Sequence, residues 1–430
     1  MDGGPPAGGG SPAGGVREDG EVTVLGAGIV GLCCALSLLE RGHGVRLIDR
    51  DGPGRGASFG NAGVVSPWSV VPQCLPGIWR DVPGWLLRAD GPVKLRWRDG
   101  PRVLPWALRF LRNATPGRVA AISDAMHTLM DGNIEAYRHH LAGTPHADAI
   151  RDSHYVMVYE PGTRPDLDDL PYALRRKVGA RVREVGGSEL RALEPALSPR
   201  YERGVLIEGQ ARLVSPARLC EALADKARAL GATIERLEVT RLERREGGGL
   251  RLHGDGATFD APRAVIALGG WSGKLLAPLG VSLPLMAERG YHMRFERPGV
   301  ELAHSVMDVG AKVVVSSMED GLRTAGTAEF AAVDAPPDMR RTRHFPAAAR
   351  RLLPDLDTSR ATPWMGVRPS LPDNLPAIGP IAGLSGVVAA FGHSHYGMGM
   401  APATGRFVAQ MLDGGTPNAD MTPFSPRRFA

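Results

Sequence analysis

A G-x-G-x-x-G motif, GAGIVG, follows a short apolar run at residues 22–25 near the start of the chain. In such a turn the first glycine permits a sharp bend, the second lets a phosphate approach the backbone, and the third lets a helix pack on a strand. The phosphate then meets the free N–H groups at the start of that helix. The motif therefore predicts a pyrophosphate-binding turn made of Gly26, Ala27, Gly28, Ile29, Val30 and Gly31.

A second apolar run, residues 45–48, follows the helical segment and ends at Asp49. A carboxylate at this position can accept hydrogen bonds from the ribose hydroxyls of an adenosine. Arg50 comes next, and it is either a ligand for a 2′-phosphate or a solvated arginine beside the site. The order of strand, glycine turn, helix, strand and acid predicts a dinucleotide site, and at this point both NAD(P) and FAD fit it.

The amino-acid composition limits the classes of protein to which this chain can belong. The chain has 430 residues and is 43% hydrophobic, which predicts a large core and two domains. Residues 1–19 are mostly Gly, Pro, Ala and Ser, a composition that predicts a disordered tail and lacks the apolar segment of a secretory signal. No run of about 18 apolar residues is present to span a membrane.

The cysteines and the charges exclude other classes of site. The four cysteines have no zinc-binding spacing, and we expect them to be buried and reduced in a cytoplasmic protein. The net charge of +5 comes from arginines scattered among acids rather than from a basic run. This distribution does not favour binding to nucleic acid.

Residues 68–112 hold five of the seven tryptophans among many arginines. Tryptophan beside arginine is typical of a surface that lies on a membrane interface, so residues 78–112 are a candidate for peripheral contact with the inner face of the membrane. The alternative is that they form ordinary helices that cover the second domain.

Local patterns predict the elements that follow. A helical period extends over residues 119–142, and Ser215 before a proline begins a helix that ends at Gly231, ahead of a strand around Val239. Further strands are expected in YVMVYE, in residues 265–268, and in GYHMRFE, KVVVSSM and GLRTAGTAEF. The chain then ends in a strand, a glycine loop and a last helix.

Glycine-rich segments at residues 58–63, 269–270 and 392–399 lie far apart in the chain. FAD binds in an extended form and needs backbone contacts along its whole length, and these segments would supply them. A chain that returns twice to its nucleotide-binding part predicts a discontinuous cofactor domain, with a substrate domain assembled from insertions. This order favours FAD over NAD.

Four motifs together resemble one family. GAGIVG with Asp49, SFGNAGVVSP, AVIALGGWS, and WMGVRPSLPDNLPAIG followed by GHSHYGMGMAPATG are similar to the FAD-binding segments of the D-amino-acid oxidase/dehydrogenase (DAO) superfamily of FAD-dependent oxidoreductases. The family includes glycine oxidase and sarcosine oxidase. The resemblance covers residues 21–425 and is strongest to bacterial D-amino-acid dehydrogenases.

The resemblance implies an α/β fold: a discontinuous, Rossmann-like FAD-binding domain of the glutathione-reductase type, and an α+β substrate domain with a mixed sheet. The expected FAD-binding segments are residues 20–70, 200–285 and 362–430, and the expected substrate-binding segments are residues 71–199 and 286–361.

The resemblance also assigns cofactor contacts beyond the glycine turn. The sarcosine-oxidase branch attaches its flavin through a cysteine near the C-terminal motifs, but this chain has no cysteine after Cys220, so FAD is expected to be non-covalent. The further residues assigned to FAD are Ser58, Asn61, Ala62, Gly63, Val239, Gly269, Trp271, Gly392, Gly397, Met398, Gly399 and Met400.

Oxidation of an amino acid at Cα requires its C–H bond to face flavin N5 at about 3–3.5 Å. A planar guanidinium orients the substrate by gripping its carboxylate in two places. Arg368 stands in the G-x-R-P where the family places this arginine, and a structural arginine is the alternative. Tyr396 is expected to line the pocket and His395 to offer a backbone carbonyl to the amine, with Tyr291 and His292 as further candidates for the pocket wall.

The predicted reaction is hydride transfer from an amino acid, expected to be a D-amino acid from the resemblance, to FAD. The imino acid then hydrolyses to a keto acid and ammonia. The electron acceptor is a quinone or oxygen. No metal is expected, because His393 and His395 have no acid or cysteine to complete a ligand set.

Three alternatives remain open at this stage. The first is an oxidase for glycine or N-methyl amino acids that uses oxygen. The second is an FAD-binding subunit of a larger amine dehydrogenase, and the third is an NAD-dependent dehydrogenase with an unusual second domain.

Overall fold

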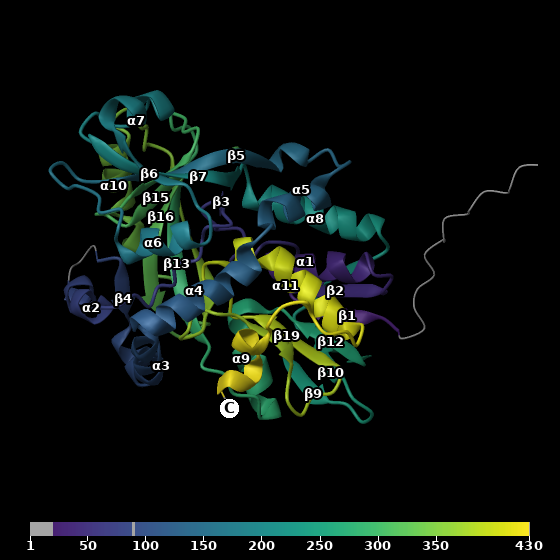
Figure 1. Ribbon diagram of the computed structural model, residues 1–430. Helices are drawn as coiled ribbons and strands as arrows, with labels where there is room; N and C mark the ends of the chain where they lie inside the picture. The colour runs from purple at the N-terminus through teal and green to yellow at the C-terminus, as the bar shows by residue number, and fades with distance from the viewer. Residues whose placement is uncertain (1–19, 88–90, 430) are drawn as a thin grey trace, which may run out of the picture.

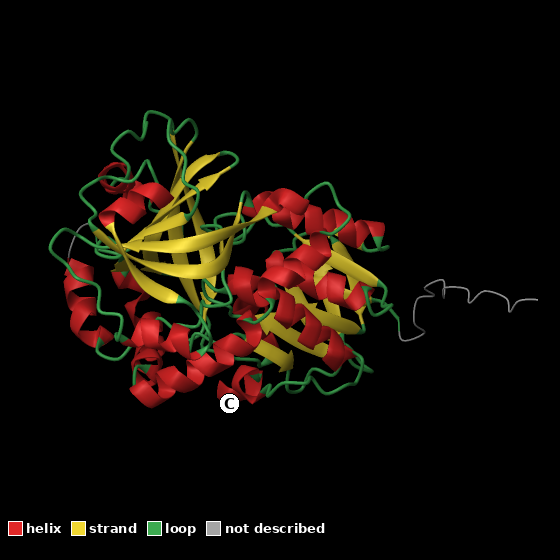
Figure 2. Cartoon of the chain, turned by 45° about the horizontal axis from the view of Figure 1, so that its top comes forward, coloured by secondary structure: helices red, strands yellow, loops and turns green. Residues whose placement is uncertain are grey.

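The computed structural model describes residues 20–87 and 91–429, so the expected disordered tail lies outside the described residues. Two sheets lie side by side with helices packed around them (Figures 1 and 2). Each sheet takes strands from distant parts of the chain, so neither is made by one continuous segment.

The six-stranded sheet contains the predicted nucleotide-binding unit. Its strands pair in parallel except β18, which is antiparallel to β19. Parallel strands need crossover connections, and here these include whole insertions between the strands. In spatial order the strands are β18 (Ala377–Pro380), β19 (Val387–Phe391), β12 (Arg263–Ile266), β1 (Val22–Leu25), β2 (Val45–Asp49) and β8 (Thr233–Arg236).

Helices cover one face of this sheet, and a small antiparallel sheet covers the other. On the helical face the first and last helices touch closely, because a Cβ added at Gly405 would lie 2.4 Å from the backbone oxygen of Cys33. The helices are α1 (Ile29–Leu39), α8 (Pro216–Ala229) and α11 (Gly397–Leu412). The opposite face carries β9 (Arg241–Arg244), β10 (Leu250–Gly254), β11 (Ala257–Ala261) and α9 (Ser272–Leu276).

The ten-stranded sheet is mixed, as expected for the substrate side. Most of its neighbours are antiparallel, whereas β14 with β5 and β16 with β4 are parallel. The main path runs through β17 (Ala361–Ser370), β13 (Met286–Phe295), β16 (Gly321–Phe330), β15 (Val313–Met318), β14 (Ser305–Asp308), β5 (Ile150–Val158), β7 (Arg203–Leu213) and β3 (Val64–Val65). The strands β4 (Val93–Leu95) and β6 (Val182–Gly186) pair at its sides.

The remaining helices pack around the large sheet and between the two sheets. None of the described helices is both long and apolar enough to cross a membrane. These helices are α2 (Ile78–Leu87), α3 (Gly100–Asn113), α4 (Pro116–Met130), α5 (Asn133–Leu141), α6 (Leu170–Lys177), α7 (Gly187–Leu193) and α10 (Phe345–Leu352).

Several local expectations are confirmed and others are not. The helix expected from Ser215 begins there, since the Ser215 hydroxyl accepts a hydrogen bond from the Arg218 N–H at 3.2 Å. The helix expected over residues 119–142 is two helices, because Gly132 adopts a φ of 66° between them. Val239 lies between β8 and β9 rather than in a strand.

Sheet membership differs from the expected segment boundaries at three strands. β3, β7 and β17 were expected with the FAD-binding segments, but all three belong to the large sheet. β7 pairs along its length with β5, and β17 pairs with all ten residues of β13. Helices α4 and α5, expected on the substrate side, pack against α11. The division into two domains itself stays a prediction.

Candidate active site

A cavity of about 1250 Å³ extends from the start of α1 to the concave side of the large sheet. Pockets for drug-sized ligands measure about 300–1,000 Å³, so this cavity has room for a long cofactor together with a substrate. Its walls include the predicted glycine turn, the loop after it, strands of both sheets, and the beginning of α11.

The glycine turn has the geometry that the motif predicts. Gly26 adopts a φ of 103°, and a Cβ on it would lie 2.4 Å from the backbone oxygen of Ala267 in the neighbouring strand connection. A Cβ on Gly31 would lie 1.8 Å from the Gly26 carbonyl oxygen. Gly28 is the N-cap of α1 and lines the cavity. The turn therefore exposes the helix start to the cavity, as a pyrophosphate requires.

Asp49 holds this turn as well as lining the cavity. Its Oδ2 accepts a hydrogen bond from the Ala27 N–H at 2.8 Å, and its Oδ1 accepts from the N–H groups of Asp51 and Gly52 at 2.9 and 3.0 Å. A carboxylate has about four acceptor positions, so one remains for a ribose hydroxyl. The G-x-G-x-x-G motif predicts the ribose contact but not the bracing of the turn.

Arg50 is not freely solvated, because its guanidinium lies over the ring of Trp271 at 4.0 Å. The indole Nε1 of Trp271 donates a hydrogen bond to Asp334 at 3.1 Å. Arg50 and Trp271 both line the cavity, so the stacked pair forms one wall of its nucleotide end.

The loop after β2 closes on the start of α1. The Ser58 hydroxyl accepts a hydrogen bond from the Ile29 N–H at 3.0 Å. Further along, the guanidinium of Arg323 donates to the carbonyl oxygens of Phe59 and Asn61 at 2.8 and 2.7 Å, and burial lowers the pKa of Arg323 to about 10. Arg323 thus fixes this loop from the large sheet, a role that no local motif indicates.

Most residues assigned to the cofactor reach the cavity, and their individual contacts stay predictions. Those that line it are Gly26, Gly28, Ile29, Val30, Asp49, Arg50, Ser58, Asn61, Ala62, Val239, Gly269, Trp271, Gly397, Met398 and Gly399. Those that do not line it are Ala27, Gly31, Gly63, Gly392 and Met400. Several of these shape the backbone instead: Gly392, for example, adopts a φ of 90° and would place a Cβ 2.5 Å from the Leu371 side chain.

Arg368 lies on the cavity face of β17 with one part of its guanidinium already held. Its Nη1 donates to Glu288 Oε1 at 3.0 Å, while the other Glu288 oxygen accepts from the Ser370 hydroxyl at 2.7 Å. The guanidinium crosses Gly290, where a Cβ would lie 2.4 Å from Cζ. Among the described residues, Nε and Nη2 of Arg368 have no hydrogen-bond partner, so they are available to a carboxylate.

Glu288 is fully enclosed, and its charge is supported by its neighbours. Burial by itself raises the pKa of Glu288, but the charge of Arg368 and the hydrogen bonds from Ser370 and Arg368 bring it below its usual value. Glu288 is therefore an anion that orients Arg368, and the pair as a whole is neutral.

His395 and Tyr396 lie at the turn before α11. His395 faces the cavity, and its removal from bulk water lowers its pKa to about 4, so the imidazole is neutral at pH 7. The ring of Tyr396 packs against that of His395 at 4.0 Å, and its hydroxyl donates to the Val71 carbonyl oxygen at 2.6 Å. Tyr396 thereby connects the turn to the loop at residue 71.

Of the two residues expected in the pocket wall, Tyr291 lines the cavity and His292 does not. The Tyr291 hydroxyl donates to Glu329 at 2.6 Å, and the side chain belongs to the apolar core behind the sheet, although Tyr291 touches the cavity wall. His292 does not line the cavity, and its ring stacks on Trp364 at 4.8 Å. Successive residues of a strand point to opposite faces, so the Tyr291 side chain lies on the other face of β13 from Gly290 and His292.

Trp364 is a cavity residue that the motifs did not single out. Its indole fills the space beside two glycines, since a Cβ on Gly60 or Gly366 would lie 1.7 or 2.1 Å from ring atoms. Trp364, Gly366 and Arg368 alternate along β17 and share one face. The sequence did contain a signal for Trp364, because residues two and four positions before Arg368 lie on the same face of a strand.

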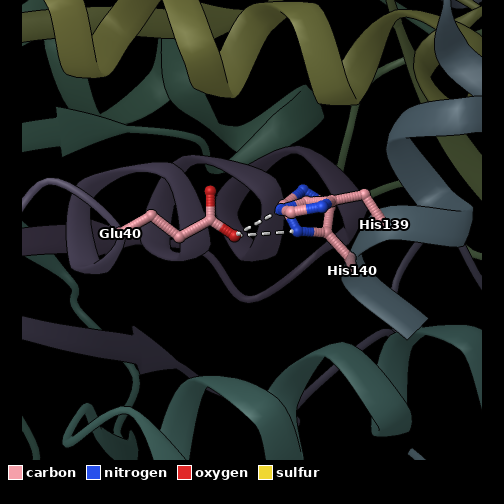
Figure 3. Close-up of side chains that lie close together, drawn as sticks. All are labelled: Glu40, His139 and His140. Carbon is pink, nitrogen blue, oxygen red and sulfur yellow. Dashed lines mark ion pairs between the residues drawn. The ribbon is translucent and has the colours of Figure 1, made fainter. Parts of the chain in front are cut away.

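Within the described residues, one group of histidine and carboxylate side chains has metal-like spacing, and it lies outside the cavity. Glu40, at the end of α1, is approached by His139 and His140, at the end of α5 (Figure 3). The nitrogen-to-oxygen distances to Glu40 Oε1 are 3.6 Å from His139 and 3.2 Å from His140. The contact with His140 lowers the pKa of Glu40, and it joins the ends of α1 and α5.

Comparison with known proteins accounts for this architecture. Residues 21–411 match the family model described as DAO, FAD dependent oxidoreductase. A protein named D-amino-acid oxidase from Bradyrhizobium diazoefficiens is 38% identical over 96% of this chain and 99% of its own length. A D-amino acid dehydrogenase from the same organism is 31% identical over 95% of this chain and 99% of its own length.

Solved structures show the same fold at lower sequence identity. Glycine oxidase from Geobacillus kaustophilus superposes with a TM-score of 0.71 at 24% identity, covering 95% of this chain and 98% of that one. L-proline dehydrogenase from P. horikoshii also gives a TM-score of 0.71, at 17% identity, covering 95% of this chain and 97% of that one.

The family match, the open helix start and the long cavity agree on one cofactor. The cradle beside Gly28 fits a pyrophosphate, and the cavity continues from there to Arg368, as an extended dinucleotide requires. The chain belongs to the DAO family of FAD dependent oxidoreductases.

Proposed function

We propose that this protein oxidises the Cα–N bond of D-amino acids, giving an imino acid that hydrolyses to a keto acid and ammonia. The observation that carries the proposal is Arg368, whose guanidinium lies in the FAD cavity with Nε and Nη2 free for a carboxylate. Support for the D-configuration comes from the two relatives named above, an oxidase and a dehydrogenase of D-amino acids.

FAD, when bound, accepts the hydride equivalent from Cα. The chain's own residues bind and orient the substrate. Arg368 grips the carboxylate, and Glu288 keeps the guanidinium in place across Gly290. Neutral His395 faces the cavity next to this pair and is available to hydrogen-bond the substrate amine through its ring or its carbonyl. Among the described residues that line the cavity there is no cysteine, which supports non-covalent FAD.

The test is anaerobic absorbance of the purified yellow protein before and after D-amino acids, L-amino acids, glycine and N-methyl amino acids are added. We expect D-amino acids to bleach the flavin, because the isolated chain holds both the FAD cavity and the carboxylate anchor. Bleaching only by glycine or N-methylglycine would favour the oxidase alternative. A protein that no amine bleaches would favour an electron-transfer subunit and contradict the proposal. The rate of reoxidation in air then separates an oxidase from a dehydrogenase.

The electron acceptor that we propose is a quinone reached from a membrane surface. Helices α2 and α3 line the cavity and also expose apolar side chains, of which Leu87, Leu104 and Leu108 lie outside the cavity lining. Of the seven large apolar side chains that are exposed among the described residues, five lie on these helices: Trp79, Leu87, Leu104, Leu108 and Leu111. The α3 helix also carries Arg102, Arg109 and Arg112. Exposed apolar residues beside arginines suit an anionic bilayer surface.

Vesicle sedimentation tests this contact. We expect the protein to sediment with vesicles that contain phosphatidylglycerol, and the double variant Leu104→Gln/Leu108→Gln to bind them at least about 100-fold more weakly, because each leucine contributes roughly 1.5–3 kcal/mol when it is buried. Activity with a water-soluble dye should persist, since neither leucine lines the cavity. Leu230→Gln, at an exposed leucine after α8, is the matched control. A wild-type protein that stays in the supernatant at low salt would contradict membrane contact.

A further inference from the structure

A second arginine, Arg175, lines the same cavity as Arg368. It lies on α6, at the side of the cavity formed by β5 and β14. Its Nη1 donates to the Pro171 carbonyl oxygen at 3.0 Å. Among the described residues no carboxylate forms an ion pair with Arg175, although its neighbour Arg176 pairs with Asp168 at 3.2 Å. The mechanism proposed above makes no use of it.

The surroundings of Arg175 are aromatic and apolar. Burial lowers its pKa, and the ionisable side chains that act on it most strongly are tyrosines, including Tyr155, Tyr172 and Tyr396. Burial raises the pKa of Tyr155 to about 12, so this phenol is neutral at pH 7 and cannot balance the charge. A cation in such a wall is costly unless an anion compensates it.

A neutral amino-acid substrate does not require the positive charge of Arg175. Arg368 is balanced by Glu288, and a zwitterionic substrate brings no net charge of its own. Lys312 places its ammonium over the ring of Trp85 at 3.9 Å and lies within electrostatic range of Asp81. At the substrate end of the cavity, Arg175 is therefore the cation that an additional anion would neutralise.

Tyr396 relates Arg175 to the substrate position. Its ring packs on His395, which faces the cavity, and the charges of both Arg175 and Glu288 act on its hydroxyl. Since Glu288 holds Arg368, both arginines lie around the same turn at the start of α11. A substrate held at Arg368 thus extends its side chain into a cavity that Arg175 also lines.

We propose that Arg175 binds a second acidic group of the substrate, so that the protein prefers amino acids with a side-chain carboxylate to neutral ones. The inference deepens the proposed function and depends on it: Arg368 takes the carboxylate next to the reacting carbon, and the five N–H donors of Arg175 include a free pair for the distal carboxylate.

The test compares kcat/KM for D-glutamate and D-aspartate with kcat/KM for D-alanine and D-methionine. We expect the wild type to favour an acidic substrate by at least about 10-fold, and Arg175→Met to lower kcat/KM for that substrate by about 100-fold, as loss of a buried charge pair does. Neutral substrates should change by less than about three-fold. Arg175→Lys should recover part of the loss. The matched control is Arg176→Met, because Arg176 is the next residue of α6, is exposed, and pairs with Asp168.

A binding measurement makes the test independent of turnover. Succinate and glutarate should perturb the flavin spectrum of the wild type at lower concentration than acetate or butyrate, and Arg175→Lys should reduce this difference. Equal use of acidic and neutral substrates by the wild type would overturn the inference while leaving amino-acid oxidation intact. An equal loss for both classes in Arg175→Met would also overturn it, by showing that Arg175 holds the α-carboxylate. If no amino acid bleaches the flavin, the proposed function itself fails.

Discussion

Replacing Arg368 by alanine should lower kcat/KM for the amino-acid substrate by about 10³-fold, on the order of 4 kcal/mol. The side chain offers Nε and Nη2 to the carboxylate, so its loss removes a charge-assisted, bidentate contact and leaves the Cα hydrogen without a defined orientation. Steady-state kinetics with a soluble electron acceptor measures the effect, and flavin bleaching by excess substrate shows whether any reduction remains.

The alanine variant also leaves Glu288 buried without its cation, which costs about 3–5 kcal/mol of stability. Arg368→Lys separates the two effects, because a lysine keeps a positive charge beside Glu288 but lacks the planar fork. We expect this variant to retain FAD and the wild-type melting temperature and to lose about 10²-fold in kcat/KM. Wild-type KM and kcat in a folded Arg368→Lys protein would show that Arg368 does not hold the carboxylate.

Gly31→Ala should destabilise the protein and abolish retention of FAD. The added methyl group would lie 1.8 Å from the Gly26 carbonyl oxygen, which is backbone and cannot move aside without shifting the glycine turn. Overpacking of this kind costs about 1–3 kcal/mol, and the same shift displaces the N–H groups that meet the pyrophosphate. Urea unfolding of the apoprotein and flavin absorbance after gel filtration measure the two effects.

Gly117→Ala is the matched control for Gly31→Ala. Gly117 also lies in the first turn of a helix, α4, but a Cβ there meets no atom within 4 Å. Alanine at such a site should be neutral or stabilise the protein by about 0.4–1 kcal/mol. Equal FAD content in the two variants would contradict the packing role assigned to Gly31.

The parts of the site that follow from neighbouring residues were predictable. The spacing of Gly26, Gly28 and Gly31 determines a turn because each requirement is local: a positive φ, an open cradle and a close contact within one strand–turn–helix unit. Asp49 follows from the same unit. The mixed sheet and the discontinuous cofactor side follow from the order of the motifs and from the family resemblance, and the family match confirms them.

The residues that hold the site in place depend on strand pairing, and they could not be predicted from the sequence. Glu288 meets Arg368 because β13 and β17 pair in the register that sets these two residues opposite each other. Arg323 reaches the loop at Phe59 from β16, more than 260 positions along the chain. A sequence pattern contains no information on which distant strands become neighbours, or with which register.

Tyr291 is a further residue whose placement depends on strand pairing. Its position at the start of the expected strand GYHMRFE suggested a role in the pocket wall, but a strand turns alternate side chains to opposite faces. Gly290 lies under Arg368, whereas the Tyr291 hydroxyl lies on Glu329 behind the sheet. The choice between the two faces was decided by the pairing of β13 with β17, which no local signal defines.

The close packing of α11 on α1 has a consequence for synthesis of the protein on the ribosome. The strand, turn and helix at residues 22–39 emerge first, but the helix that covers them is formed by Gly397–Leu412, near the end of the chain. At about 5–20 residues per second, on the order of tens of seconds separate the two. Throughout that interval the apolar side of α1 lacks its partner, so the nascent chain exposes a surface suited to chaperones and can load its cofactor only after translation is nearly complete.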